Sequence, residues 1–272
     1  MAELVDAPDL KSVTSGCESS SLSSPMSLSE LLNYLERICM PTIDFIPEDK
    51  EYGLVYDPPA PASAFLPEWY KTSNRKVLDG PKVVSGLPFQ TVKSCMPVLD
   101  AINTGYILPC QADITFNIKP DGHLDLSWRT ADRNFVSMHD TKQLGDFKVP
   151  EEFYPQAFKF EHKWIVKTPP GYSTMFFTPY WRYDLPYYIL PGVVDTDEHG
   201  TSVNFPFLIR KDWEGTVYTG DPLVQLMPFK REEWDHNVHA DKDEDTMLKW
   251  KRASRTQENA YKTHTRKVKV WK

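Results

Sequence analysis

The feature that most constrains the fold is a series of short segments, separated by turn residues, that runs over residues 106–232. In ADITFNIK and HLDLSW apolar residues alternate with polar ones, and the turn residues Pro120-Asp121-Gly122 stand between them, which predicts a β-hairpin. Further strand candidates follow without an intervening helical pattern: FKFEHKWIVKT, YSTMFFTPYW, PYYILPGVV, VNFPFLIR, GTVYTG and PLVQLMPF. This succession predicts a mainly β domain of barrel or sandwich type over residues 106–232.

Composition agrees with this class of fold. The chain has 272 residues, and its 23 prolines and 12 glycines favour short strands and rigid turns over a helical bundle. A formal charge of −7 argues against an overall attraction to nucleic acid or to an anionic membrane. The four cysteines show no CxxC spacing, so we expect neither a disulfide framework nor a zinc site, and a cytoplasmic location. No apolar run reaches the roughly 18 residues of a membrane helix, and no membrane contact is expected.

The segments before residue 106 divide into a tail and a wrap. Residues 1–26 are rich in serine and predict a disordered tail. They also resemble the spurious translation of a transfer-RNA gene, which makes Met26 a candidate start. Residues 27–105 predict an N-terminal α/β wrap: a helix that begins at the capping box Ser27 to Glu30, the strand TIDFIP, and a helix over VKSCMPVLDAIN that ends at Gly105.

The tail over residues 233–272 is first acidic and then basic. Asp243 to Thr246 can cap a helix that continues to about Lys262. A solvated helix is one interpretation of this segment. The other is a nucleic-acid contact, with Trp250 and Trp271 available for stacking, through the basic residues Lys249, Lys251, Arg252, Arg255, Arg266, Lys267 and Lys269.

Three segments carry a resemblance to a known superfamily. They are Pro169-Pro170-Gly171-Tyr172, then GVVDTDEHG over residues 192–200, then GDPLVQL over residues 220–226. In this order and at this spacing they resemble motifs of the dUTP pyrophosphatase and dCTP deaminase superfamily, whose fold is the β-clip. The chain after its first 26 residues is also similar to an uncharacterised family found largely in tailed phages and related prophages. The resemblance implies a β-clip domain, a homotrimer, and a place in the host cytoplasm or in the virion.

The resemblance also implies roles for individual residues. Asp195 would orient the water that attacks a nucleoside triphosphate, and Asp197 would hold the turn at the substrate. Arg182 and Gln225 would contact phosphate, with Gly220 beside the substrate. Mg²⁺ would be held mainly by the substrate phosphates, so no metal-ligand cluster is expected in the protein.

Departures from the superfamily pattern leave two hypotheses open. Glu198 stands where the superfamily has a tyrosine, no serine follows Arg182, Ile107 replaces an expected aspartate, and the Gly-rich C-terminal arm is missing. Most groups that stabilise triphosphate charge are therefore absent. The first hypothesis is a dUTPase-like cleft that binds, and in an active enzyme hydrolyses, a nucleoside triphosphate. The alternative is a non-catalytic structural or nucleic-acid-interacting phage protein that uses the β-clip as a scaffold.

Three further patterns admit a functional and a structural interpretation. The aromatic run Tyr180, Trp181, Tyr183, Tyr187 and Tyr188 suits core or interface packing, and base stacking is the alternative. The sequence His123-Leu124-Asp125 matches the start of an iron(II) facial triad, which needs a distal histidine such as His162 or His199, but it is also a plain exposed hairpin. Residues 230–233, KREE, predict a solvated strand end.

Overall fold

A computed structural model describes residues 40–80, 89–129, 135–239, 244–256 and 260–272, without the side chains of 254–256. Residues Thr42–Lys272 form one compact unit. The expected disordered tail over residues 1–26 and the helix predicted after Ser27 lie outside the described residues.

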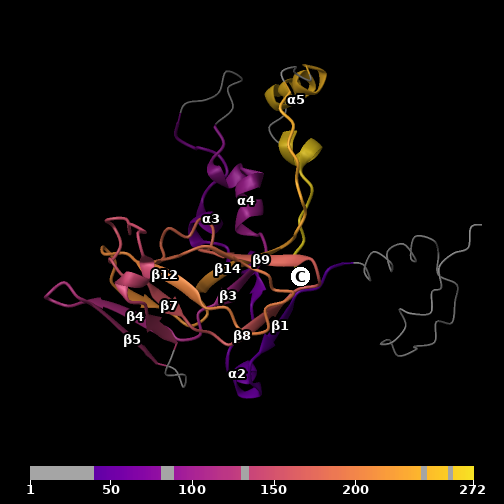
Figure 1. Ribbon diagram of the computed structural model, residues 1–272. Coiled ribbons are helices and arrows are strands. Elements are labelled where there is room, and N and C mark those ends of the chain that lie inside the picture. The colour runs from indigo at the N-terminus through magenta and orange to yellow at the C-terminus, as the bar shows by residue number, and fades with distance from the viewer. Residues whose placement is uncertain (1–39, 81–88, 130–134, 240–243, 257–259) are drawn as a thin grey trace, which may run out of the picture. The chain divides into compact units, whose positions relative to one another are not determined.

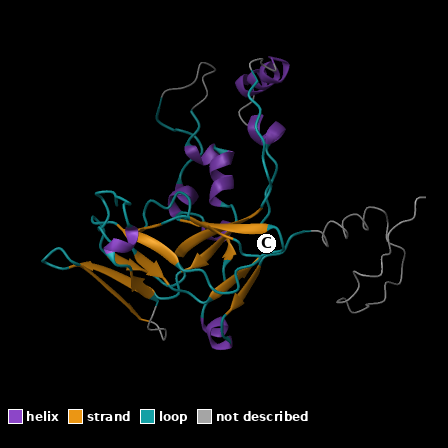
Figure 2. Ribbon diagram, in the orientation of Figure 1, coloured by secondary structure: helices purple, strands orange, loops and turns teal. Residues whose placement is uncertain are grey.

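The described chain is mainly β, as predicted, and its strands form antiparallel sheets (Figure 2). A five-stranded sheet has the order β11 (Gly192–Val194), β9 (Tyr172–Phe177), β14 (Pro222–Lys230), β3 (Tyr106–Pro109), β2 (Ala60–Pro61). A four-stranded sheet has the order β10 (Tyr187–Ile189), β12 (Phe205–Ile209), β7 (Phe158–Phe160), β6 (Val136–Met138). The smaller sheets are β13 (Gly215–Val217), β4 (Asp113–Ile118), β5 (Leu124–Arg129), and the pair β1 (Asp44–Pro47), β8 (Trp164–Lys167).

Among the residues that the structure describes, one α-helix follows β1, two lie between β2 and β3, and one follows β14. The α-helices are α2 (Lys50–Val55), α3 (Glu68–Thr72), α4 (Met96–Ile102) and α5 (Glu244–Thr256). Short 3-10 turns cover Ala62–Phe65, Val92–Ser94 and Thr141–Leu144, and a π-helical turn covers Tyr261–Thr265. Strands β1 and β2 come from the predicted N-terminal wrap, so this segment contributes to the sheets of the main domain.

The hairpin predicted from ADITFNIK and HLDLSW is confirmed. Strand β4 pairs with β5 in antiparallel register from Asp113↔Arg129 to Ile118↔Leu124. The barrel alternative is wrong for the described residues, because none of the four sheets closes on itself. Each sheet keeps two edge strands, β11 and β2 in the largest one. Figure 1 shows β14 beside β9 and β3 at the centre of this sheet.

The acidic segment GVVDTDEHG does not join two strands that pair with each other. Strand β11 pairs with β9, with Val193 opposite Met175, whereas the next strand, β12, pairs with β10 and β7. The chain therefore changes sheets after the turn. The physical reason is the composition of β12, whose residues Phe205, Phe207, Leu208 and Ile209 are all buried in the core.

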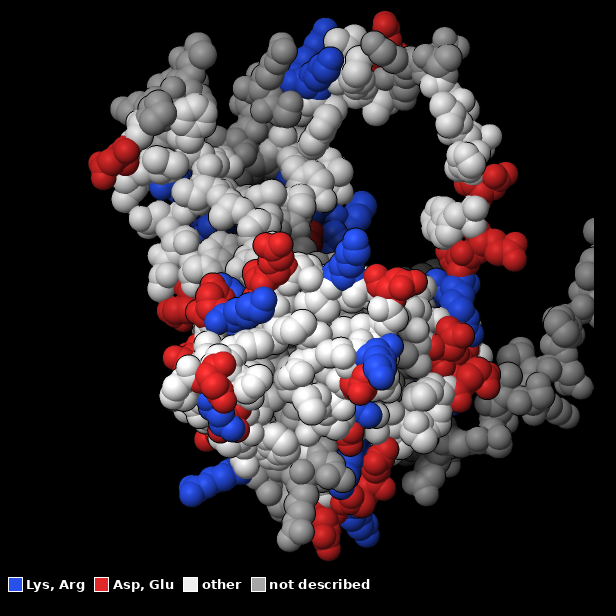
Figure 3. All heavy atoms as spheres, turned by 60° about the vertical axis from the view of Figure 1, so that its left-hand side comes forward, with Lys and Arg blue, Asp and Glu red and all other residues white. Residues whose placement is uncertain are grey.

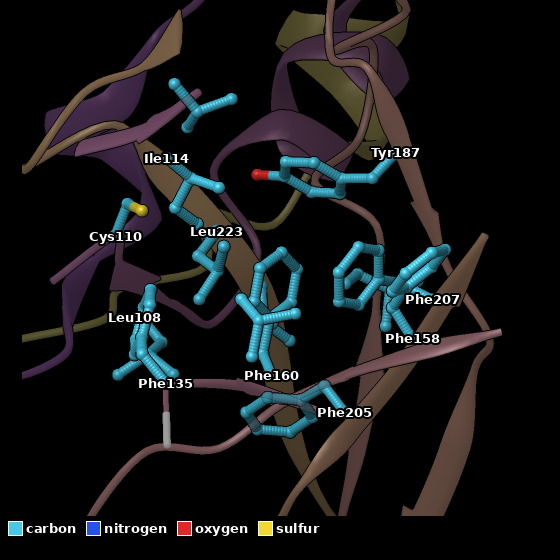
Figure 4. Packing of buried hydrophobic residues seen from close by; sticks show 14 of the residues in the cluster. Leu108, Cys110, Ile114, Phe135, Phe158, Phe160, Tyr187, Phe205, Phe207 and Leu223 are labelled. Atoms are coloured by element: carbon cyan, nitrogen blue, oxygen red, sulfur yellow. The ribbon is translucent and has the colours of Figure 1, made fainter. Parts of the chain in front are cut away.

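The core collects aromatic side chains from several sheets. Phe160 on β7 is fully buried and stacks on Phe207 of β12, with ring centroids 3.7 Å apart. Figure 4 shows these rings together with Leu108 of β3 and Leu223 of β14, so the five-stranded and four-stranded sheets share this core. The same packing holds in place the loops that leave the strand ends.

His162 is a buried titratable group in this core. Its ring lies flat against Phe205, with centroids 4.8 Å apart, and its Nδ1 accepts a hydrogen bond from the backbone N–H of Trp164 at 3.0 Å. Its Nε2 has no hydrogen-bond partner within the described part of the chain. Burial lowers the pKa of this imidazole to about 4, because the charged form would lose its hydration.

We expect His162 to destabilise the fold in mild acid. The unfolded chain binds a proton at a pH near 6.5 and the folded chain only near 4, so the free energy of unfolding falls as pH falls through this window. The loss is on the order of 3 kcal/mol. In His162→Asn an amide oxygen can replace Nδ1 as the acceptor but does not titrate. Urea unfolding at a series of pH values should show this loss in the wild type only, and parallel curves would contradict the assignment.

Candidate functional site

The acidic turn, residues 195–199, begins where β11 ends. The backbone N–H groups of Glu198 and His199 both donate to the carbonyl of Asp195, at 3.0 and 2.8 Å. Thr196 is completely buried, and its hydroxyl bonds those of Thr168 at 2.7 Å and Thr174 at 2.8 Å. This hydroxyl network fixes the turn against the five-stranded sheet.

Asp197 is held by Arg231 and is almost closed to solvent. Its side chain is 3% exposed, and the Arg231 guanidinium donates to both carboxylate oxygens, at 2.8 Å to Oδ1. The backbone N–H of Gly171 donates to Oδ2 at 2.8 Å. The Arg231 hydrogen bonds hold the pKa of Asp197 well below its usual range. Asp197 therefore ties down the turn, as the sequence indicated, but offers little surface to a substrate.

Arg231 is the residue of this cluster that sequence reasoning missed. The KREE segment was predicted to be a solvated strand end, yet Arg231 also donates to Ser173 Oγ at 3.0 Å and to the Tyr172 carbonyl at 3.0 Å. The reason is the register of β14, which places Lys230 opposite Tyr172 and so brings the next residue to the acidic turn. The available signal was the pair of cations Lys230 and Arg231 at the end of a predicted strand, together with two aspartates in a turn elsewhere in the sequence.

Asp195 is the accessible carboxylate of the cluster. Its side chain is 65% exposed, accepts a hydrogen bond from Ser173 Oγ at 2.6 Å, and lies 3.3 Å from Arg231. This geometry leaves lone pairs of one carboxylate open to solvent, beside a guanidinium whose charge is shared with Asp197.

Gln225 does not reach a surface of the chain. Gln225 is only 1% exposed, and its Oε1 accepts a hydrogen bond from the backbone N–H of Tyr180 at 2.8 Å. Its Nε2 donates to the carbonyl of Thr104 at 2.6 Å, with those of Ala101 and Ile102 nearby. All polar atoms of the amide are thus occupied. The expected phosphate contact at Gln225 is corrected to an internal clamp between β14, the end of α4 and the loop after β9.

The remaining residues predicted for one site lie apart within the chain. Gly220 is in the turn before β14, where its N–H donates to the Cys110 carbonyl at 2.8 Å. Asp195 lies beside the other end of this nine-residue strand, a strand length of about 30 Å away. Arg182 is in the loop between β9 and β10 and forms a bidentate pair with Asp184, at 2.9 Å. The single cleft expected from these residues is therefore not assembled by one chain, because β14 separates them.

A cleft of about 510 Å³, here called the aromatic cleft, lies instead over the loop between β9 and β10. Its floor includes the buried rings of Phe177 and Tyr187, and Tyr183, with 80% exposure, stands at its rim. The aromatic run of residues 180–188 therefore lines a concave surface. The other rings around the cleft are Phe153, Tyr180, Trp181 and Tyr188.

The arginines that line the aromatic cleft are each paired with an aspartate. Arg210 donates to Asp212 through two nitrogens, at 2.9 and 2.7 Å, and to the carbonyl of Tyr183 at 3.0 Å. Arg182 pairs with Asp184 in the same way. On the face in Figure 3, positive and negative side chains also lie next to one another in small groups. The aromatic cleft thus offers ring faces and fixed polar edges without an unpaired cation among its lining arginines.

Trp181 has a strained backbone conformation. Its φ of 63° lies in the left-handed region, and it is the sole described residue other than glycine with a positive φ. Its carbonyl accepts a hydrogen bond from Nε1 of Trp69 at 3.1 Å, which holds the turn in place. Strain of this kind persists where the surrounding structure over-determines the conformation, and it clusters at binding sites.

The basic residues of the tail lie in different surroundings. Lys249, Lys251 and Arg252 are exposed on α5, whereas the side chain of Arg255 is outside the described residues. Arg266 and Lys269 both bind Asp100, at 2.7 and 3.0 Å. The indole of Trp271 makes an edge contact with the ring of Tyr106, with centroids 5.9 Å apart, and is partly buried against the core.

Metal-ligand geometry is not found in the described segments. There, no group of three His, Cys, Asp or Glu side chains is placed to hold an ion. Asp125 of the HLD segment pairs with Lys119 at 3.4 Å on the exposed hairpin, while His162 is buried in the core. The helices within the described residues are too short or too polar to cross a membrane.

Comparison with known proteins adds no identity to these observations. No family model, no curated protein and no solved structure shows a significant match to the chain. The assignment of a function therefore depends on the geometry of the aromatic cleft and of the acidic turn.

Proposed function

We propose that the protein is a non-catalytic binding protein that binds an uncharged ring compound, through an apolar face of that ring, in the aromatic cleft. The observation that carries this proposal is the set of exposed rings around a 510 Å³ concavity whose arginines are each paired with an aspartate. Such a lining binds ligands through apolar ring faces and orients them with a few polar edges. The base of a nucleoside or a sugar ring has this chemistry.

Charge neutralisation supports binding over triphosphate hydrolysis. Phosphoryl transfer needs cationic groups or donors aimed at the developing phosphate charge. Arg182 is bound by Asp184, Arg231 is bound by Asp197, and Gln225 is buried. Arg182 and Gln225 are the residues that the superfamily resemblance placed at the phosphates, and Arg231 is the cation that lies beside Asp195.

Nucleotide hydrolysis at the acidic turn is the second candidate function. It is favoured by Asp195, whose carboxylate is 65% exposed and is oriented by Ser173. In this case Asp195 would orient the attacking water, Mg²⁺ would arrive with the substrate phosphates, and neighbouring copies in a homotrimer would supply the cations.

Removal of an exposed ring from the aromatic cleft should weaken binding by about tenfold, which is the expected loss of one stacking contact. The variants are Tyr183→Ala and Tyr188→Ala. A thermal-shift screen of nucleosides, neutral sugars and Mg²⁺ nucleoside triphosphates first identifies a ligand. Calorimetric titration then measures the affinity of the wild type and of each variant for that ligand. Tyr218→Ala is the matched control, because Tyr218 is 61% exposed but lies outside the cleft.

The outcome that favours the second candidate is distinct. Stabilisation by Mg²⁺ triphosphates alone, lost in Asp195→Asn and kept in Tyr188→Ala, would contradict the binding proposal. Salt-sensitive retention on DNA that depends on Lys249, Lys251 and Arg252 would instead favour a nucleic-acid role for the tail.

A further inference from the structure

A second hollow of about 500 Å³ adjoins the aromatic cleft. Trp181 and Tyr183 line both concavities, so the rings of these two residues lie on the border between them. The second hollow is completed by residues of the N-terminal wrap, Pro67, Glu68, Trp69 and Val92, together with Asp184. Residues of the N-terminal wrap and of the loop between β9 and β10, which are far apart in the sequence, therefore build one continuous lining.

The rings along this lining form a connected series. The Trp69 and Trp181 rings have centroids 5.8 Å apart, and the Trp181 and Tyr183 rings 6.2 Å apart. The hydrogen bond from Trp69 Nε1 to the Trp181 carbonyl fixes the first pair. A ligand with a single ring would contact only part of this series, whereas a chain of rings would contact it along its length.

The net charge of the lining disfavours a nucleic acid as the ligand. The lining of the two hollows contains four carboxylates, those of Glu68, Glu152, Asp184 and Asp212, against two guanidiniums, those of Arg182 and Arg210. A nucleic acid has one phosphate for each base and would be repelled by this excess of negative charge. An uncharged chain meets no such penalty.

A peptide strand added to the edge of the sheet is also disfavoured. Strand β10 is an edge strand and contributes Tyr187 and Tyr188 to the aromatic cleft. The hydroxyl of Thr178, however, accepts from the N–H of Ile189 at 2.8 Å and lies 3.4 Å from the carbonyl of the same residue. At Ile189, the N–H and carbonyl that an incoming strand would need are thus already in contact with a side chain.

We infer that the aromatic cleft and the second hollow form one groove that binds an uncharged oligosaccharide, with successive sugar rings against Trp181 and its neighbours. The apolar C–H face of each sugar ring packs on an aromatic face. Its hydroxyl groups donate to the remaining lone pairs of the Asp184 and Asp212 carboxylates, which their arginines hold in fixed positions. This inference rests on the proposed function and specifies its ligand as a chain.

The test compares sugar chains of increasing length. The full chain is titrated calorimetrically with glucose, N-acetylglucosamine and mannose and with neutral oligomers of each. Affinity should rise about tenfold from the single ring to an oligomer in at least one series, because a second aromatic surface is engaged. Trp181→Gly should remove this gain. Glycine adopts the positive φ of this position without strain, so the variant is expected to fold.

Each outcome separates the inference from the proposed function. If a single ring binds and no oligomer binds more tightly, the groove is wrong and the aromatic cleft still stands. If nucleosides bind but no sugar does, the oligosaccharide is wrong while the cleft again stands. If neither sugars nor nucleosides bind, both fail. The groove is also wrong if affinity still rises with chain length in a folded Trp181→Gly variant. Tighter binding of oligothymidylate than of any neutral chain would overturn it as well.

Discussion

Gly105→Ala is expected to lower the free energy of unfolding by about 4 kcal/mol or more, at the extreme end for a single substitution. Gly105 ends the segment after α4 with a φ of 70°, and a Cβ atom placed there would lie 2.0 Å from the backbone carbonyl oxygen of Leu226. Because that oxygen belongs to the central strand β14, the clash cannot be relieved by rotating a side chain. The substitution would force the N-terminal wrap away from the five-stranded sheet.

A matched glycine controls for backbone strain. Gly122 also has a positive φ, of 81°, but an added Cβ would meet no atom within 4 Å. We expect Gly122→Ala to cost about 1 kcal/mol, which is the strain of the left-handed conformation alone. Urea unfolding of the two variants measures the difference. Equal losses would contradict the close approach of Gly105 to β14.

Gln225→Leu should lower the free energy of unfolding by about 3 kcal/mol, because it leaves a buried N–H and a buried carbonyl without partners. The amide now bonds the N–H of Tyr180 at 2.8 Å and the carbonyl of Thr104 at 2.6 Å. Leucine fills a similar volume, so cavity formation contributes little. Circular dichroism during urea unfolding is the measurement. Gln143→Leu, at an exposed cap, is the control with an expected loss of about 1 kcal/mol.

This variant also separates the two functional hypotheses. An internal clamp predicts a less stable protein, in which Tyr180 at the cleft is less well held. A phosphate ligand predicts a protein of nearly unchanged stability that no longer binds triphosphates. The second pattern would restore the role that the superfamily resemblance implied for Gln225.

The strands were predictable from the sequence because their signal is local. The alternation in residues 112–119 and 123–128, with a turn between them, determines which face of each strand is buried and which strand is its partner. The mainly β class followed from the repetition of this signal. Sheet membership did not follow, since the pairing of β11 with β9 and of β12 with β7 depends on which buried surface each strand meets.

The candidate site was less predictable, because its contacts join distant residues. Arg231 reads as part of a solvated charge run, and only the register of β14 with β9 brings it to Asp197. Arg182 was recognised as a cation, but its partner Asp184 lies two residues later and cancels its charge. The aromatic run was visible as a run, whereas its place around a concavity depends on the loop between β9 and β10 and on Trp69.

The most direct test of the central claim is a map of amide and indole chemical-shift changes in the labelled protein. The protein is titrated first with the uncharged ring compound that gives the largest thermal shift in the screen. A separate sample is titrated with Mg²⁺ deoxyuridine triphosphate. The account predicts that the uncharged compound shifts the signals of residues 180–188, including the Trp181 indole, and leaves Asp195 unchanged. Changes centred on Ser173, Asp195 and Arg231, obtained only with the triphosphate, would contradict it.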